Sequence, residues 1–297
     1  MNTAVASNTT SDRDVESAWH RHAYAKRARG IVLTILGLLF AMVYVFPFYW
    51  MVNSALKPRG EIMTSTPLFW PKHFTWENFV VAVTQTNFLL NLKNSLIVVV
   101  TAVVFSLIVA FFACYALTRF RFRGRTAIMV SVLIVQMLPG TAMLIPQFLV
   151  FNQLGLLNTY AGLILAYISG VLPFSIWNLR NFFLNIPIDI EEAAMLDGAS
   201  TWKILWYISL PLLMPGLVST SVFAFISGWN DYLTAYTFMK DQSMYTLPVW
   251  LASFSTPRGV DYGAQMAAAT LFSLPVVIVF VILQRHVTDG AVMGAVK

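Results

Sequence analysis

Acidic side chains gather in one short segment of this 297-residue chain. Asp189, Glu191, Glu192 and Asp197 lie between residues 181 and 203, although the whole sequence has only 13 acidic residues. Alanines and larger apolar residues fill the positions between them, and Gly198 follows directly. A short helix with carboxylates and a small-residue face suits docking into a groove of another protein. The segment therefore indicates a protein contact.

Local rules predict that this segment folds as a helix, a turn and a second helix. Asp189 can cap the first helix, with Glu192 three residues later, in an arrangement close to a capping box. Gly198 stands where a left-handed residue ends a helix, and Ser200 or Thr201 can cap the next one. A helix lying on the bilayer surface is the alternative, although such helices favour Lys and Arg over acids.

Motifs for catalysis and metal binding are absent from the sequence. It contains no HExxH and no GxSxG, and no Lys follows a Gly, so it has no Walker A loop. The single cysteine, Cys114, excludes an intramolecular disulfide and a multi-cysteine metal site. Its apolar neighbours favour a small buried side chain. We therefore expect no catalytic residue, no metal and no cofactor bound by this chain.

Composition excludes several classes of protein. Hydrophobic residues make up 58% of the chain and charged residues 11%, with a mean hydropathy of +0.70, whereas soluble domains are about 25% charged. These values exclude a soluble enzyme, a disordered scaffold and a nucleic-acid-binding domain. Basic loops beside membrane spans account for the formal charge of +6.

The apolar residues form runs long enough to cross a membrane, which takes about 20 residues. We predict an all-α membrane protein with six transmembrane helices and a cytoplasmic helix between spans four and five. The predicted spans are residues 31–52, 95–117, 127–150, 159–180, 204–227 and 266–284. Residues 1–29 are predicted to be a disordered cytoplasmic tail, and 30–297 the transmembrane domain.

Basic residues predict the orientation of the spans. With a cytoplasmic N-terminus, thirteen of the 19 Lys and Arg residues lie in cytoplasmic segments, including the cluster from Arg119 to Arg125. Cytoplasmic loops carry such an excess. We therefore expect a multi-pass protein of a bacterial-type inner membrane with both termini in the cytoplasm.

The spans have no charged residue in their central parts, which argues against proton coupling and voltage sensing. They do contain polar residues, which can either hydrogen-bond between helices or line a substrate path. The polar residues are Gln136, Thr141, Gln147, Ser169, Ser175 and Ser219 to Ser221. Prolines also recur, and each tends to kink its helix. They are Pro47, Pro139, Pro146, Pro173, Pro211, Pro215 and Pro275.

One spaced motif resembles the permease subunits of ABC importers. Glu192-Ala193-Ala194, three residues, Gly198, nine residues, and then Ile208-Ser209-Leu210-Pro211 match the EAA pattern of that family at every specified position. Other short motifs are similar to its carbohydrate branch, of the maltose type. They are Ser54-Ala55-Leu56-Lys57-Pro58, Asn94-Ser95-Leu96, Trp229-Asn230-Asp231-Tyr232-Leu233, Tyr245-Thr246-Leu247-Pro248-Val249 and Gly294-Ala295-Val296-Lys297.

The resemblance implies a sugar importer permease that changes access with ATP hydrolysed elsewhere. Implied partners are a second permease, two cytoplasmic ATPase subunits that bind ATP and Mg, an extracytoplasmic solute-binding protein, the lipid bilayer and a sugar. The residues implied to couple to the ATPase are Glu192, Ala193, Ala194, Asp197, Gly198, Leu210 and Pro211. Glu192 would be the charged contact. The tail Gly294, Ala295, Val296 and Lys297 either reaches the ATPase or is a frayed end.

Candidates for a substrate path are Gln136, Tyr167, Trp177, Asn230, Asp231 and Tyr232. The motif that begins at Trp229 also fits an aromatic belt at the membrane surface, as do Trp50 and Trp70. Three other functions stay open at this point. The chain could be an ABC permease for another solute, such as a polyol, a glycerol phosphate or a peptide. It could also be an ion-coupled secondary transporter or a membrane scaffold.

Overall fold

The computed structural model describes residues 11–84, 86–256 and 259–295, and it divides the chain into two compact units. The first unit is residues 1–53, and the second is residues 54–297. Helix α1 (Ser11–Ala55) supplies nearly all of the described first unit. Its residues Arg29–Ala55 are long and apolar enough to cross a membrane, as predicted for the first span.

The start of α1 differs from the prediction. Residues 11–29 are helical and continuous with the first span, whereas we expected a disordered tail. Several of these residues, among them Ala23, Ala25, Lys26 and Arg27, are good helix formers, and the apolar helix that follows supplies a nucleus from which helix extends at low cost. Residues 1–10 lie outside the described part of the chain.

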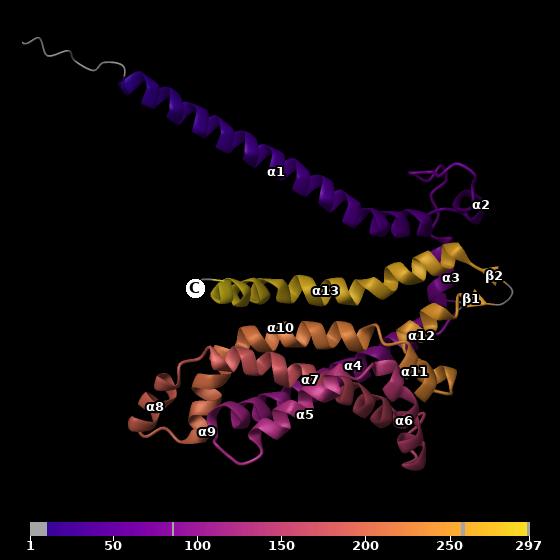
Figure 1. Ribbon diagram of the computed structural model, residues 1–297. Coiled ribbons are helices and arrows are strands. Elements are labelled where there is room, and N and C mark those ends of the chain that lie inside the picture. The colour runs from indigo at the N-terminus through magenta and orange to yellow at the C-terminus, as the bar shows by residue number, and fades with distance from the viewer. Residues whose placement is uncertain (1–10, 85, 257–258, 296–297) are drawn as a thin grey trace, which may run out of the picture. The chain divides into compact units, whose positions relative to one another are not determined.

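The second unit consists of helices and one small antiparallel hairpin (Figure 1). The helices of the outer segments are α2 (Arg59–Ile62), α3 (Glu77–Thr84), α11 (Leu233–Phe238), the 3-10 turn η2 (Gln242–Met244) and α12 (Leu247–Ala252). The long helices are α4 (Phe88–Arg119), α7 (Tyr160–Leu184), α10 (Leu210–Trp229) and α13 (Tyr262–Ala295). Strands β1 (Ser255–Thr256) and β2 (Gly259–Val260) form the hairpin.

Short elements fill the remaining segments. They are α5 (Arg125–Met137), α6 (Gly140–Gln153), α8 (Ile188–Leu196), α9 (Thr201–Ile204) and the π-helical turn η1 (Leu205–Ser209). Among the described residues, five helices are long and apolar enough to cross a membrane, and α5 with α6 makes a sixth if the pair forms one span.

The third predicted span is broken. Helices α5 and α6 meet at an angle of 103°, where we expected one helix over 127–150. Pro139 disfavours the helical conformation of the residue before it, and Leu138 is extended, with φ −71° and ψ 132°. The other span prolines, such as Pro146 and Pro173, lie inside continuous helices. Among the span prolines of the described residues, Pro139 alone lies at a break between two helices.

Helices α4 and α7 form the centre of the second unit, and α10 packs against both of them. Cys114 is buried in this core, where its thiol donates to the Ile176 carbonyl oxygen at 3.0 Å, as predicted for a small buried side chain. The helices approach closely at Gly216 of α10. A Cβ there would lie 2.5 Å from the ring of Phe182 on α7.

Substituting Gly216→Ala is therefore expected to destabilise the protein, because overpacking costs about 1–3 kcal/mol. Gly170→Ala is the matched control, since a Cβ on Gly170 meets no atom within 4 Å, and alanine favours a helix by about 1 kcal/mol over glycine. Thermal unfolding in detergent should show a lower midpoint for Gly216→Ala only. Equal midpoints for the two variants would contradict the close approach.

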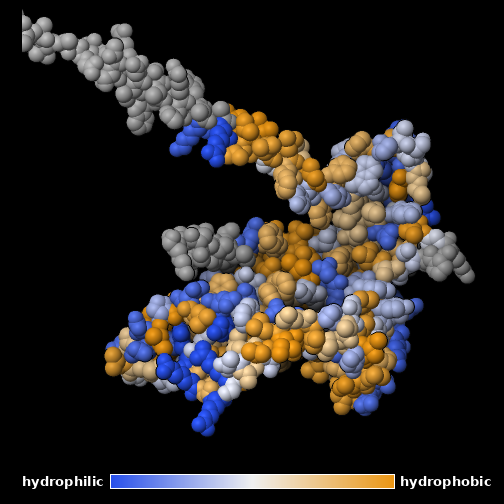
Figure 2. Space-filling view, viewed as in Figure 1, coloured by the Kyte–Doolittle hydropathy of each residue, from blue (hydrophilic) through white to orange (hydrophobic). Residues whose placement is uncertain are grey.

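The two ends of the second unit differ. Helices α8 and α9 lie at one end, and α11, α12 and the hairpin lie at the other (Figure 1). Figure 2 shows polar side chains gathered around α8 and α9, and apolar side chains along α13 and α6. The acidic segment therefore lies at the opposite end of the helices from the predicted outer loops.

Candidate functional site

Helix α8 ends in a Schellman motif, as the position of Gly198 predicted. The backbone N–H of Ala199 donates to the Ala194 oxygen at 2.9 Å, and that of Gly198 donates to the Met195 oxygen at 3.0 Å. Gly198 has a φ of +83°, a conformation that glycine adopts without steric cost. The turn fixes where α8 stops and α9 begins.

The start of α8 differs from the prediction. The helix begins at Ile188, so Pro187 occupies the capping position and Asp189 lies inside the first turn. A carboxylate there still interacts favourably with the helix dipole. Ser200 precedes α9, as expected, but its side chain makes no capping hydrogen bond.

The side of α8 turned to solvent combines apolar and acidic residues. Leu196 is 90% exposed, and Ile190, Glu192 and Ala193 are exposed as well. Ala194 is half-buried. An exposed surface of this kind, with apolar and acidic side chains on one helix, is suited to contact with another protein.

Glu191 has the opposite environment from its neighbour Glu192. Its side chain is 2% exposed, and both Nε and a terminal nitrogen of Arg119 lie 3.0 Å from Oε1. The Ser209 hydroxyl donates to the same oxygen at 3.2 Å. Arg119 also donates to the Ile186 carbonyl oxygen at 3.1 Å and lies over the Phe183 ring, 5.5 Å from its centroid.

We call the three side chains Glu191, Arg119 and Ser209 the carboxylate clamp. Sequence reasoning gave Glu191 no role, because Arg119 lies 72 residues earlier in the chain. The signal that could have indicated a role for Glu191 is its position directly before Glu192. Adjacent residues of a helix point to different sides, so one of the two carboxylates must face away from the side that carries the other.

The return from α9 into the fifth span contains the π-helical turn η1. This turn ends at Ser209, directly before Leu210 and Pro211. Proline lacks a backbone N–H and its ring crowds the carbonyl of the previous turn, which a wider turn relieves. Pro211 therefore disturbs the helix as predicted, but the chain stays helical. Leu210 is half-buried and Pro211 is exposed.

A cavity of about 550 Å³ lies between the broken span and helices α7 and α10. Its lining includes three predicted path residues, Gln136, Tyr167 and Asp231. Further polar or small residues line it: Thr141, Gln147, Ser169, Gly170, Ser227 and Thr234. The break between α5 and α6 places residues from both helices around the same space.

Polar side chains of this cavity also bond to one another. The Gln147 amide donates to the Ser169 hydroxyl at 3.0 Å, and the Tyr167 hydroxyl donates to the Asp231 carbonyl oxygen at 3.2 Å. Interhelical hydrogen bonding and cavity lining, which the sequence left as alternatives, therefore occur in the same residues.

The Asp231 carboxylate is fixed at the start of α11. It accepts hydrogen bonds from the Thr234 backbone N–H at 2.8 Å and from the Thr234 hydroxyl at 2.9 Å. Burial raises the pKa of the Asp231 carboxyl above its usual value, although these hydrogen bonds act in the opposite direction. The cavity thus has an acidic group at its edge, and no Lys or Arg is among its lining residues in the described chain.

Three predicted path residues lie outside this lining. Trp177 has its ring 5.9 Å from the Arg180 guanidinium. Asn230 donates to the Ile226 carbonyl oxygen of its own helix at 2.8 Å, and Tyr232 stacks on Tyr236 with ring centroids 5.3 Å apart.

The aromatic-belt interpretation is wrong for Trp229. Its side chain is fully buried, stacks on Phe225, and donates to the Phe272 carbonyl oxygen at 3.1 Å. Trp70, by contrast, is 75% exposed. The position of Trp229 near the end of a span does not indicate whether its ring points into the protein or toward the membrane surface.

The motif that opens the second span and the motif that begins at Tyr245 contact each other. The Asn94 amide donates to the carbonyl oxygens of Ser243 and Tyr245, both at 2.9 Å. The Ser95 hydroxyl accepts from the backbone N–H of Leu247 at 2.7 Å. These two motifs therefore hold the outer segment against α4.

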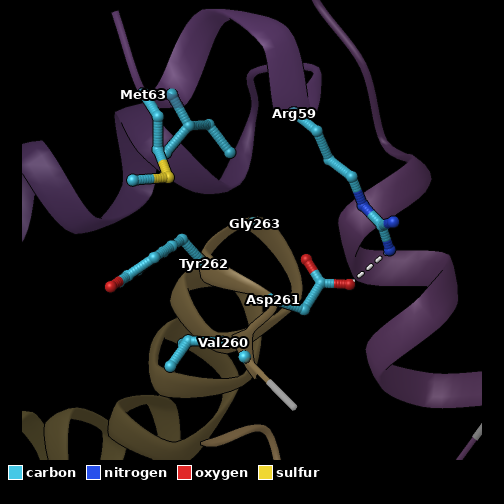
Figure 3. A pocket seen from close by; sticks show the side chains of 8 residues that line it. Arg59, Met63, Val260, Asp261, Tyr262 and Gly263 are labelled. Carbon is cyan, nitrogen blue, oxygen red and sulfur yellow. Dashed lines mark hydrogen bonds and ion pairs between the residues drawn. The ribbon is translucent and has the colours of Figure 1, made fainter.

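The first outer segment is held in a similar way. The amide of Asn78 donates to the carbonyl oxygens of Ala55 and Lys57 at 2.9 and 2.7 Å. A small pocket of about 340 Å³ lies beside it, where Arg59 pairs with Asp261 (Figure 3). Arg59 is largely exposed, so this pair contributes little to stability.

Half of the predicted tail contact falls beyond the described chain. Gly294 and Ala295 end α13, and Val296 and Lys297 lie outside the described residues.

Comparison with known proteins gives one family. Residues 102–291 match the model of the binding-protein-dependent transport system inner membrane component. This match covers more than half of the chain and includes α8 and all of the residues that line the cavity.

Two curated proteins and one solved structure are similar to this chain over most of its length. The diacetylchitobiose uptake system permease protein DasC of Streptomyces coelicolor is 42% identical, over 85% of this chain and 92% of that protein. The trehalose/maltose transport system permease protein MalG of Thermococcus litoralis is 35% identical, over 90% and 96%. A chain of a bacterial ABC transporter involved in import of the acidic polysaccharide alginate aligns with a TM-score of 0.77 at 26% identity, over 88% and 97%.

Proposed function

Because this chain belongs to the family of binding-protein-dependent transport system inner membrane components, we propose that it is the permease subunit of an ATP-driven importer for a neutral sugar or oligosaccharide. ATP and Mg bind to separate ATPase subunits, and the chain itself performs no reaction. The uptake systems named for diacetylchitobiose and for trehalose or maltose support the sugar substrate.

The observation that carries this proposal is the difference between the buried and the exposed side of α8. Glu191 faces inward and is bonded to the spans, whereas Glu192, Ala193 and Leu196 remain uncovered. In the proposed complex this uncovered side docks on the ATPase, with Glu192 as the charged contact. The residues from Asp197 through Gly198 make the turn that presents it, and Leu210 and Pro211 lead back into the span.

The partners of the complex follow from the relatives. In the proposed complex, a second permease subunit, two ATPase subunits and a solute-binding protein complete the importer. The solute-binding protein is supported by a structure of a bacterial alginate ABC transporter in complex with an alginate-bound periplasmic protein, one chain of which shares this fold. Both termini and α8 then lie on the cytoplasmic side, which agrees with the excess of basic residues in those segments.

The cavity between α5, α6, α7 and α10 is the proposed half of the substrate path in this chain. Hydroxyl and amide groups such as those of Gln136, Thr141 and Ser227 can exchange hydrogen bonds with sugar hydroxyls, and Tyr167 offers an aromatic face. A phosphate or a carboxylate would instead require basic groups, which this lining lacks in the described residues.

Co-purification tests the proposal. The tagged full-length chain should bring down an ATPase and a second permease, and diacetylchitobiose or maltose, presented with the binding protein, should raise the ATPase rate of the complex. A chain that purifies without any ATPase would contradict the proposal, as would a complex whose ATPase rate responds to glycerol phosphate and not to sugars.

A further inference from the structure

The carboxylate clamp connects α8 to α4 and to the segment that leads into α10 through a single oxygen atom, and to α7 through Arg119. Glu191 lies on α8, Arg119 is the last residue of α4, and Ser209 ends the π-helical turn that leads into α10. Arg119 further contacts Phe183 of α7. Displacement of α8 therefore changes the distances to the ends of three other helices.

The environment of the clamp makes this connection stiff. The side chains of Glu191 and Arg119 are 2% and 10% exposed, so water cannot readily replace either partner, and a bond between charged groups is strong there. Helix α8 also packs against α9, its own neighbour in the chain. The π-helical turn at Ser209 marks a segment with irregular geometry, of the kind often found at functional sites.

We propose that Glu191 is a positioning residue for transport: through Arg119 and Ser209 it makes α8 move together with α4 and α10, so that movement at the ATPase surface changes access to the cavity. This inference rests on the proposed function. In this proposal Glu192 contacts the ATPase, and Glu191 links the movement of α8 to that of the spans.

The clamp predicts a specific defect. Glu191→Gln keeps the size of the side chain but removes the charge that pairs with Arg119. We expect the assembled complex still to hydrolyse ATP, and sugar uptake per ATP hydrolysed to fall about tenfold, within the usual range for loss of coupling between two sites. Asp189→Asn is the matched control, because it removes a carboxylate from an exposed position of the same helix.

A double-mutant cycle separates coupling from stability. Arg119→Gln should give at least the defect of Glu191→Gln, since it also removes the contacts of Arg119 with Ile186 and Phe183. The double variant should be no worse than Arg119→Gln alone, because the interaction between Glu191 and Arg119 is already lost in each single variant. Ser209→Ala removes only a hydroxyl and should give a smaller loss of sugar uptake per ATP hydrolysed. This variant keeps the proposal testable if the charge variants fail to assemble.

The measurement is sugar uptake and ATP hydrolysis in proteoliposomes that contain the complete transporter, with each value divided by the amount of assembled complex. Reduced assembly with an unchanged ratio of uptake to hydrolysis would overturn the proposal and leave Glu191 a purely structural residue. A wild-type ratio in Ser209→Ala and Glu191→Gln together would also overturn it. Failure of the proposed function is distinct, because the wild-type complex itself would then show no ATP-driven uptake.

Discussion

Gly198→Val is expected to abolish most ATP-driven uptake while the chain still inserts in the membrane. A β-branched residue at the observed φ of +83° is strained by about 1–3 kcal/mol, and the strain is relieved if the turn after α8 changes. A free-energy change of this size corresponds to about a 5- to 150-fold shift in a coupled equilibrium, so α8 would rarely present its docking side correctly.

Gly198→Asn is the control for this experiment. Asn adopts the left-handed conformation more readily than other non-glycine residues, and no atom lies within 4 Å of a Cβ at this position. It should therefore retain most of the uptake. Uptake is measured in whole cells and normalised to the amount of chain in the membrane. Equal uptake by the Val and Asn variants would show that the left-handed turn is unimportant for coupling.

Charge at the docking side should matter independently of conformation. Glu192→Lys reverses the exposed carboxylate that we propose as the contact with the ATPase. Stimulation of the ATPase by sugar should be lost, although the variant inserts normally, because a positive charge at this position would repel the basic group that the proposal places on the partner. Normal uptake by Glu192→Lys would argue strongly against docking through α8.

Gly170→Trp is the second change with a large expected effect. Gly170 lines the cavity of about 550 Å³, and a Cβ there meets no atom within 4 Å, so the indole can extend into the proposed path without displacing the core. A substrate that must share this space faces an overpacking penalty of about 1–3 kcal/mol or more. We expect uptake to fall by at least about tenfold, with the basal ATPase rate retained.

The matched variant is Gly170→Ala, which adds one methyl group at the same position and should transport normally. Initial rates of radiolabelled sugar uptake, measured beside ATPase rates, distinguish a blocked path from a damaged complex. Wild-type transport by Gly170→Trp would place the path elsewhere in the assembly.

The fold was predictable where the apolar runs contain no charge. Five of the spans agree with the structure to within several residues, because burial in lipid requires about 20 apolar residues whatever their order. The break at Leu138 was not predicted, since seven prolines gave the same signal and only Pro139 is followed directly by glycine at a helix start. The helical start of α1 was also missed, because polar composition alone was taken as disorder.

The turn after α8 was predictable, but the contacts of α8 with the spans were not. Gly198 has a local conformational signature, and the structure gives the expected left-handed turn. Glu191 and Glu192 are adjacent carboxylates, and the sequence does not say which one faces the spans. That choice depends on Arg119 and Ser209, which are distant in the chain and close only in the fold. The same limit applies to Trp229, whose burial depends on Phe272 in another helix.

The most direct test of the central claim is sugar uptake into proteoliposomes that contain the whole transporter, with ATP supplied on the ATPase side. We expect uptake that requires ATP, the ATPase and the binding protein, and that is unaffected by dissipating ion gradients. The Glu192→Lys variant should lack this uptake. Uptake by this chain alone, driven by an ion gradient and without ATP, would contradict it.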